Sequence, residues 1–408
     1  MNHACTETAA GVEPSFRFGI TRRKVGSINM SSSTESGQPT VILVAGLAGA
    51  IGSTLSVAVH LLKTASHLVK PYLTTEERFA HLPLSEMVVA GWDLAGANLC
   101  RAIHDHGVIP ASIWKPLQGQ LETIPLFEAP AARMDLDAAI AAVSRDIDRI
   151  ESLYPLANRV LVNLLPAAPA LVGGENEADF RRTFNQAPDR FPDPVYALAA
   201  IRKGIPVVNF TPNEIEWPWV VENAIQKGVP LCGRDGKTGQ TFYKLVLASA
   251  WKARKLKITG WYSLNILGNS DGANLMDPER AAGKLANKTE ILEEILGYRV
   301  GDSRGCHKVH IDYYPPRGDA KEAWDVVDFE GLFGLPMSIR IDFQGRDSVL
   351  AAPMAIDLAR WMVALKQSGR CGLVPELAFF FKKPLGTDPP LSFADQISRL
   401  NALSIQAD

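Results

Sequence analysis

The sequence predicts an α/β protein with a doubly wound, mostly parallel sheet and an inserted α+β domain. Three observations predict this class: an unbroken apolar run at residues 41–45 that leads into a glycine-rich turn, strand-like and helix-like segments that alternate up to about residue 232, and short strands with irregular loops after residue 256. Strands that alternate with helices are typical of parallel sheets covered on both faces. The chain of 408 residues is long enough for about two or three domains.

The composition is typical of a globular protein and excludes several classes of partner. The formal net charge of -2 gives no electrostatic reason to expect nucleic acid or an anionic membrane. The five cysteines are scattered along the chain, which fits a reducing cytoplasm better than a disulfide framework. No apolar run reaches the roughly 18 residues of a spanning helix. We therefore expect a cytoplasmic protein with no membrane partner.

Changes in composition divide the chain into four parts. Residues 1–38 are expected to be a disordered tail, because the serine-rich stretch that ends it has no apolar side chain to bury. Residues 39–255 should form the nucleotide-binding domain and residues 256–345 the inserted domain. Residues 346–408 should return to the first domain through a helix at 349–366 that is apolar nearly all round. Residues beyond about 390 are interpreted as a polar tail.

The first predicted strand and the turn after it indicate a dinucleotide site of the Rossmann-like kind. Gly46, Gly49 and Gly52 follow the strand, and a helical pattern covers 55–63. In this context glycines let the backbone approach a pyrophosphate, and the helix N-terminus supplies N–H donors. The spacing departs from G-x-G-x-x-G because Ala48 stands at the second glycine position, and no clear acidic residue for a ribose follows about 20 residues on. A plain tight turn is the alternative.

The remaining strands of the first domain are predicted at 87–90, 159–165, 205–210 and 229–232, with helices at 136–153, 195–203 and 217–227. Ligands of doubly wound sheets bind at the carboxyl ends of the strands. Polar residues follow four of these strands, namely Asp93, Asn163, Asn209 and Asp235. We therefore expect cofactor contacts there. Residues 233–241 hold Gly-Lys-Thr, but Leu231 replaces the leading glycine of a P-loop, so we predict a small polar site and no ATP hydrolysis.

Lysines in the second half of the chain indicate an anion site. Lys284 and Lys288 are one helical turn apart, so two ammonium groups can converge on one anion. Lys382 follows three phenylalanines, which would lower the pKa of its amine by burial. A solvated lysine face and a lysine that extends from an apolar strand are the alternatives. The histidines lack a second cluster at zinc spacing and are interpreted as structural.

Together these segments resemble the myo-inositol-1-phosphate synthase family, in its compact archaeal and bacterial form. The resemblance covers roughly residues 41–386. The motifs that carry it, in the family's order, are Gly91-Trp92-Asp93-Leu94, Asn209-Phe210-Thr211-Pro212, residues 233–241, Asn265 to Gly272, the pair Lys284 and Lys288, Gly318-Asp319-Ala320-Lys321, Asp347 to Pro353, and Phe379 to Pro384.

The resemblance implies an isomerase that cyclises glucose 6-phosphate to myo-inositol 1-phosphate. In the family, NAD oxidises C5, an enolate forms and attacks the C1 aldehyde in an intramolecular aldol step, and NADH then reduces the ring ketone. The inserted domain would serve catalysis and oligomerisation. The resemblance also implies a hexose 6-phosphate substrate, a homotetramer and bound NAD, and leaves open a cation of unknown identity.

The resemblance also assigns roles to individual residues. Lys288 with Lys284 is expected at the phosphate and the aldol oxygen, Lys321 and Lys382 are expected as proton relays at the redox carbon, and Asp319 would set the charge and orientation of Lys321. The residues expected to bind the cofactor are Gly46, Gly49, Gly52, Ser53, Asp93, Asn163, Asp235, Asp271, Asp347 and Ser348. The residues expected to bind the substrate, besides Lys284 and Lys288, are Asn209, Asn265 and Asn269.

The chain departs from the family pattern after Asn163. There the family has serine or threonine near the cofactor, whereas this chain has Leu164-Leu165-Pro166-Ala167. Two alternatives follow. A related cyclase would act on fructose 6-phosphate and close a five-membered carbocycle, and a non-catalytic NAD-binding scaffold would turn over neither sugar phosphate.

Overall fold

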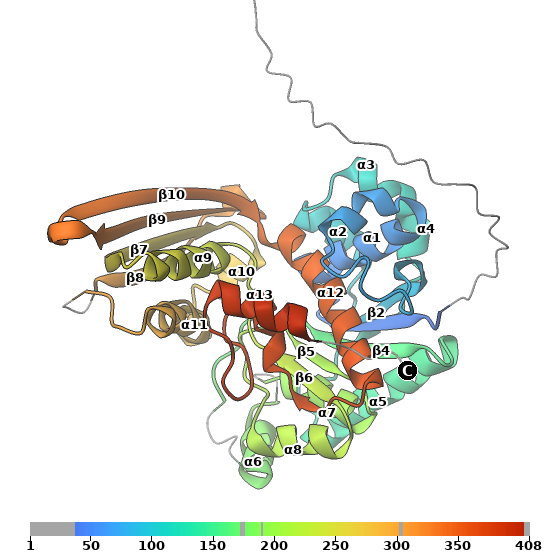
Figure 1. The fold of residues 1–408 in the computed structure, drawn as a ribbon. Helices are drawn as coiled ribbons and strands as arrows, with labels where there is room; N and C mark the ends of the chain where they lie inside the picture. Colours follow the sequence, from blue (N-terminus) through green and yellow to red (C-terminus); the bar gives the residue numbers. More distant parts are fainter. Residues whose placement is uncertain (1–36, 172–175, 189–190, 302–304, 404–408) are drawn as a thin grey trace, which may run out of the picture. The chain divides into compact units, whose positions relative to one another are not determined.

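The computed structural model describes residues 37–171, 176–188, 191–301 and 305–403. The expected disordered tail, except for its last two residues, lies outside the described residues. The described chain builds two sheets, a seven-stranded one and a four-stranded one (Figure 1). The predicted class, a Rossmann-like sheet followed by a separate mixed sheet, is confirmed. The predicted domain boundaries stay a prediction, and the second sheet uses residues 257–346.

The first sheet is parallel throughout and has the strand order β11-β6-β5-β4-β1-β2-β3. The chain runs from β1 outward through β2 to β3 and then crosses back to place β4 on the other side of β1. The strand order therefore reverses at β1, and a crevice for a ligand opens at its carboxyl end. The strands are β1 (Thr40–Ala45), β2 (Met87–Asp93), β3 (Leu126–Glu128), β4 (Asn158–Asn163), β5 (Val207–Asn209), β6 (Pro230–Gly233) and β11 (Gly372–Leu373).

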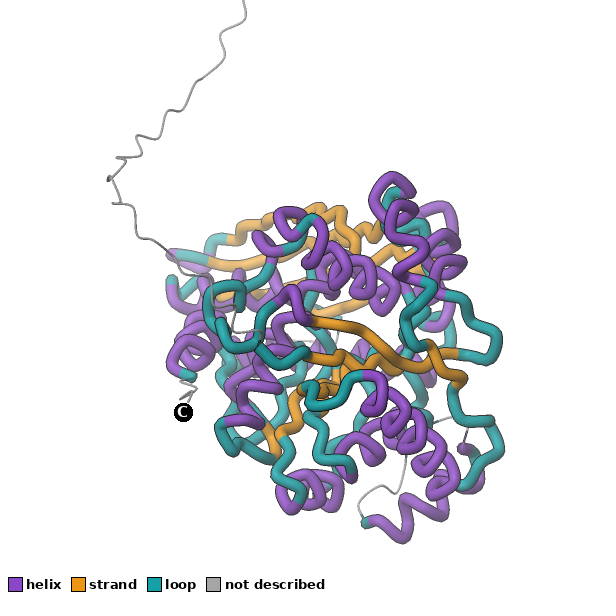
Figure 2. The backbone as a smooth tube through the Cα atoms, turned by 90° about the vertical axis from the view of Figure 1, so that its right-hand side faces the viewer, coloured by secondary structure: helices purple, strands orange, loops and turns teal. Residues whose placement is uncertain are grey.

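Alternate residues of β1 supply two separate cores. Ile42 and Val44 pack in the cluster that contains α12, whereas Val41 and Leu43 pack in the cluster that contains α5 and α7. This alternation explains why the strand is apolar at every position from Val41 to Ala45, since a strand covered on both faces has no solvent side. Figure 2 shows helices on both sides of the strands that cross its centre. The helices of this domain are α1 (Ala50–Thr64), α2 (Leu99–His106), α3 (Ala111–Trp114), α4 (Gln118–Leu121), α5 (Leu136–Leu153), α6 (Glu177–Gln186), α7 (Asp193–Arg202) and α8 (Pro218–Gln226).

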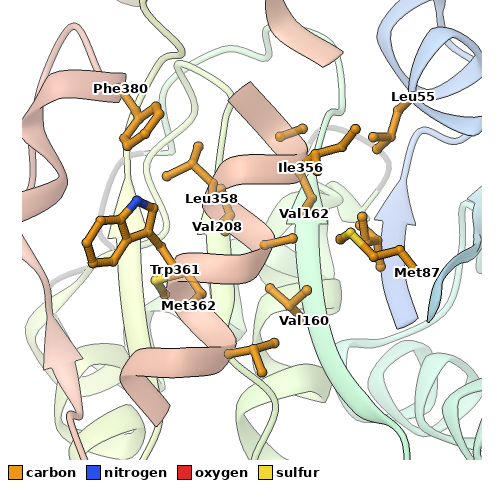
Figure 3. Packing of buried hydrophobic residues seen from close by; sticks show 14 of the residues in the cluster. Leu55, Met87, Val160, Val162, Val208, Ile356, Leu358, Trp361, Met362 and Phe380 are labelled. Carbon is orange, nitrogen blue, oxygen red and sulfur yellow. The ribbon is translucent and has the colours of Figure 1, made fainter. Parts of the chain in front are cut away.

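The apolar helix α12 (Asp347–Gln367) packs on the first sheet, as the sequence predicted. Ile356, Leu358 and Trp361 lie against valines of β4 and β5 in Figure 3. In the described part of the chain, α12 is the helix whose length and composition would allow it to cross a membrane, and 78% of that window is buried. Burial in the protein core therefore explains why α12 is apolar nearly all round.

The second sheet has the order β10-β9-β7-β8. Its long central strand β9 (Ala320–Glu330) is antiparallel to both β7 (Lys257–Leu267) and β10 (Pro336–Arg346), while β8 (His307–Tyr313) is parallel to β7. The helices α9 (Gln240–Ala253) and α11 (Pro278–Leu296) contribute to the core beside this sheet, and α10 (Ser270–Asn274) follows β7.

Two elements differ from what the sequence predicted, namely the strand β9 and a helix near the end of the chain. Charged residues interrupt the apolar pattern of β9, and one of them, Asp325, points into the interior, where it is 1% exposed. The polar tail expected beyond residue 390 was wrong. Residues Phe393–Ala402 form α13, which Ser392 caps and which buries Gln396 and Leu400. A helix that buries only two residues has a mostly polar composition, and for this reason the sequence of α13 resembled a tail.

Candidate functional site

A cavity of about 700 Å³ opens at the carboxyl ends of the strands of the first sheet. Residues that follow β1, β4, β5 and β6 line it, together with the last residues of β2, the start of α12 and one residue from β9 of the second sheet. Most of the residues expected to bind cofactor or substrate meet on its wall, together with two of the lysines expected to be catalytic: Gly46, Gly49, Gly52, Asp93, Asp235, Asn269, Asp271, Asp347 and Ser348, with Lys321 and Lys382.

The glycine turn has the geometry of an anion cradle. Gly46 has a φ of +89°, which side chains rarely tolerate, and a Cβ on Gly52 would lie 2.5 Å from the carbonyl oxygen of Leu47. The helix α1 begins directly after Gly49. Its first turn contains no acidic residue, and no side chain of the described residues caps its N-terminus. Its first N–H groups can therefore serve a phosphate.

Asp93, one of the residues expected to bind the cofactor, ends β2 and contacts the glycine turn, whereas an acidic residue for a ribose was expected about 20 residues after that turn. The 3-10 turns between residues 66 and 86 separate α1 from β2, so the spacing is about twice the usual one. Asp93 Oδ2 accepts the Ala48 N–H at 2.7 Å, and Oδ1 accepts the Leu94 N–H at 2.8 Å. Since a carboxylate has about four acceptor sites, capacity remains for ribose hydroxyls.

Two lysines of the cavity wall have carboxylate partners. Lys382 Nζ lies 2.6 Å from Asp235 Oδ1, and both side chains are buried. Lys321 Nζ lies 3.1 Å from Asp347 Oδ2, while the Thr238 hydroxyl donates to Asp347 Oδ1 at 2.9 Å. Burial alone would raise the pKa of Asp347, but the ammonium groups of Lys321 and Lys382 and these hydrogen bonds hold that pKa well below its usual range. Asp347 is therefore ionised beside the cavity.

Asp319 does not pair with Lys321 as expected. Its Oδ1 accepts hydrogen bonds from the Ser348 hydroxyl at 3.0 Å and from Asn269 Nδ2 at 3.4 Å. Burial raises the pKa of Asp319, and in the described part of the chain its buried Oδ2 has no hydrogen-bond partner. The start of α12 brings Asp347 and Ser348 to this place, and a sequence separation of 26 residues concealed the Lys321–Asp347 pair.

Four expected binding residues do not line the cavity. Ser53 donates to the Ala50 carbonyl at 3.2 Å within α1. Asn163 donates to Asp193 Oδ1 at 2.6 Å and to Asn209 Oδ1 at 3.3 Å, in a buried network that joins the ends of β4 and β5. Asn265 is buried in β7 and donates to the His310 carbonyl at 3.3 Å. Their proposed contacts with ligands stay predictions.

The other two lysines expected at the site lie on α11. Lys284 and Lys288 belong to α11, but their side chains lie outside the described residues. The convergence of all four amines therefore stays a prediction.

The structure adds residues that the sequence analysis did not select. Thr238, Gln240 and Thr241 line the cavity and come from the segment at 233–241 that was predicted as a small polar site. His106 also lines it, and its Nε2 lies 2.9 Å from the Ala48 carbonyl oxygen, although no spacing marked it. The apolar residues 164–167 form part of the wall, next to the loop at 129–132. No group of three or more His, Cys, Asp or Glu side chains gathers as a metal site in the described ranges.

Comparisons with known proteins identify relatives of this chain. Residues 239–348 match the family model described as myo-inositol-1-phosphate synthase. The chain is similar to inositol-3-phosphate synthase 1 of Bacteroides thetaiotaomicron, with 32% identity over 387 residues, 84% of this chain and 89% of that protein. Its fold is similar to inositol-3-phosphate synthase from Caenorhabditis elegans (TM-score 0.78, 20% identity, 91% of this chain, 87% of that one) and to a myo-inositol-1-phosphate synthase-related protein from Thermotoga maritima (TM-score 0.71, 20% identity, 86% and 94%).

Proposed function

The chain belongs to the myo-inositol-1-phosphate synthase family, and from this premise we propose that it is an isomerase that cyclises glucose 6-phosphate to myo-inositol 1-phosphate with NAD. One observation carries the proposal. Lys321 and Lys382, each with a carboxylate partner, line the same cavity as the glycine turn. Such a cavity can combine a nucleotide with groups that move protons.

The residues around β1 fit a dinucleotide. The glycine turn and the uncapped start of α1 would hold the pyrophosphate, and Asp93 would accept hydrogen bonds from a ribose. The apolar residues at 164–167 and 129–132 line the same cavity and offer surface to aromatic rings. When bound, NAD supplies reversible hydride transfer at C5 of the sugar.

The lysines would move protons and stabilise negative charge. We assign Lys321 and Lys382 to the relay of the proton that leaves the C5 hydroxyl and returns to it. An ammonium group held in place by an ionised carboxylate would also stabilise the negative charge of an enolate oxygen. Lys288 with Lys284 is assigned to the phosphate and the aldol oxygen, from the family resemblance. Asp235 and Asp347 would hold the two relay amines in place through their ion pairs with Lys382 and Lys321.

The test incubates the purified protein with glucose 6-phosphate and a catalytic amount of NAD and identifies the product by NMR. We expect an inositol phosphate without net formation of NADH. Lys321→Met and Lys382→Met should each lower kcat by about 100-fold or more, since a proton-transferring group contributes about 10²–10⁴. Lys227→Met, at an exposed lysine at the end of α8, is the matched control and should leave kcat unchanged. Wild-type rates in both cavity variants would contradict the assignment.

The apolar wall at 164–167 favours one second candidate, the cyclase that acts on fructose 6-phosphate. The four residues line the cavity, so a change of residue type there alters the surface that a ligand meets. Incubation with fructose 6-phosphate in the same assay distinguishes the two, because its product would be a five-membered carbocycle. A protein that binds NAD but converts neither sugar phosphate would be the non-catalytic scaffold.

The proposal also includes assembly and location. We propose a homotetramer in the cytoplasm. Light scattering on the purified protein measures the number of subunits, and fractionation of cells measures the location.

A further inference from the structure

A buried carboxylate beneath the cavity joins α9 to the central strands of the second sheet. Asp325 of β9 is 1% exposed. Its Oδ2 accepts hydrogen bonds from Gln240 Nε2 at 2.9 Å and from the Tyr243 hydroxyl, both on α9. Its Oδ1 accepts from Trp261 Nε1 at 2.6 Å and from the Ser263 hydroxyl, both on β7. Four donors fill the usual acceptor capacity of a carboxylate, so the orientation of Asp325 is fixed by its surroundings.

The same strand and the segment before α9 are linked a second time at the cavity wall. Lys321 of β9 contacts Asp347 Oδ2, and Thr238 donates to Asp347 Oδ1. Lys321 precedes Asp325 by four residues and therefore shares its face of the strand. Thr238 precedes Gln240 by two residues. The bridge through Asp347 and the bridge through Asp325 thus close a ring, and of the two carboxylates only Asp347 lines the cavity.

We propose that Asp325 is a positioning residue for the reaction: by anchoring the first turn of α9 to β9, it holds Thr238 against Asp347 and keeps Asp347 beside Lys321. This inference rests on the proposed function. Asp325 does not line the cavity, so it acts through Gln240 and the segment before it. Loss of the anchor lets Thr238 move, and Asp347 then loses one of the two contacts that orient it.

The variant Asp325→Asn tests this role, because asparagine has the same shape but presents an N–H₂ group to two of the four donors. The matched control is Asp357→Asn. Asp357 is also 1% exposed and also accepts four hydrogen bonds, from the backbone and hydroxyl groups of Thr74 and Thr75, but these partners lie outside the cavity wall. Both variants should lose thermal stability.

Only Asp325→Asn should lose turnover of the folded enzyme. We expect its kcat for glucose 6-phosphate to fall about tenfold or more, because small misplacement of a reacting group costs up to about 100-fold, while KM changes less. Thr238→Val should have the same effect, and the double variant should be no slower than the worse single variant, since both act on one contact. Equal kcat values for Asp325→Asn and Asp357→Asn, or additive losses in the double variant, would overturn the proposal.

A readout without turnover separates this inference from the proposed function. The acetylation rate of the Lys321 amine by acetic anhydride, measured by peptide mass spectrometry, should rise about threefold or more in Asp325→Asn, a change of the size that one hydrogen bond produces. The rate at Lys382, whose partner is Asp235, should stay unchanged. A wild-type protein that does not convert glucose 6-phosphate would refute the proposed function, whereas unchanged acetylation of Lys321 would refute the anchoring role of Asp325.

Discussion

Replacement of Asp235 by asparagine tests the buried pair that we assign to proton relay. Asp235 Oδ1 lies 2.6 Å from Lys382 Nζ, and the two side chains are 4% and 8% exposed. Removal of one partner of such a pair typically costs about 3–5 kcal/mol, because the other charge stays buried without compensation. The ammonium of Lys382 also acts on Asp347, so a second carboxylate remains near it. We therefore expect a loss at the lower limit, about 3 kcal/mol in the free energy of unfolding.

The backbone and the volume of the side chain do not change in this variant. Asp235 has a φ of +61°, a conformation that asparagine also tolerates. A second variant, Asp388→Asn, provides a matched control, because Asp388 has a φ of +51° and pairs with Arg399 at 3.5 Å, but its side chain is 88% exposed. An exposed pair contributes about 1 kcal/mol or less, so this control should unfold close to the wild type.

Urea denaturation at pH 7, followed by tryptophan fluorescence, measures these differences, provided that the slope against urea concentration is the same in all variants. The double variant Asp235→Asn/Lys382→Met contains no unpaired charge at the pair and should be more stable than Asp235→Asn alone. The reasoning would be refuted if Asp235→Asn were as stable as Asp388→Asn, or if the losses of the two single substitutions simply added in the double variant.

Three further predictions concern other parts of the chain. Burial lowers the pKa of Lys237 to about 7, below its value in the unfolded chain. The folded protein therefore binds fewer protons than the unfolded one, and its free energy of unfolding should rise with pH between about 7 and 10. The Lys237→Met variant should lack this rise when its free energy of unfolding is measured across the same pH range. Leu358→Ala, at a fully buried residue of α12, should cost about 2–5 kcal/mol of unfolding free energy, whereas Val349→Ala, at a 48% exposed residue, should cost within about 0.5 kcal/mol in the same urea experiment. Gly46→Ala should weaken NAD binding in calorimetry by about tenfold or more, because a Cβ at this position would lie 3.1 Å from the Leu164 carbonyl oxygen and the positive φ is unfavourable for alanine. Gly228→Ala is the control. Gly228 also has a positive φ, but a Cβ there would have no atom within 4 Å, so this variant should bind NAD normally.

Features that depend on local burial were predictable from the residue pattern alone. β1 is apolar from Val41 to Ala45 because helices cover both faces of its sheet, and α12 is apolar nearly all round because it lies in the core. The glycine turn was recognisable because its backbone conformation excludes side chains, which restricts the residue type at fixed positions. These patterns were sufficient to predict the α/β class, the glycine turn after the first strand and the order of most strands and helices.

Which polar groups meet depends on how the helices and strands pack against one another. Asp347 rather than Asp319 pairs with Lys321, because α12 starts beside the cavity, and Asp93 reaches the glycine turn from β2 across an unusually long connection. No sequence pattern singled out Asp325, because a single buried carboxylate interrupts the apolar pattern of a strand without revealing its donors, which lie on α9 and β7. Hydrogen-bond partners distant in sequence leave no periodic signal, because their distance depends on how whole elements pack and not on the residues between them.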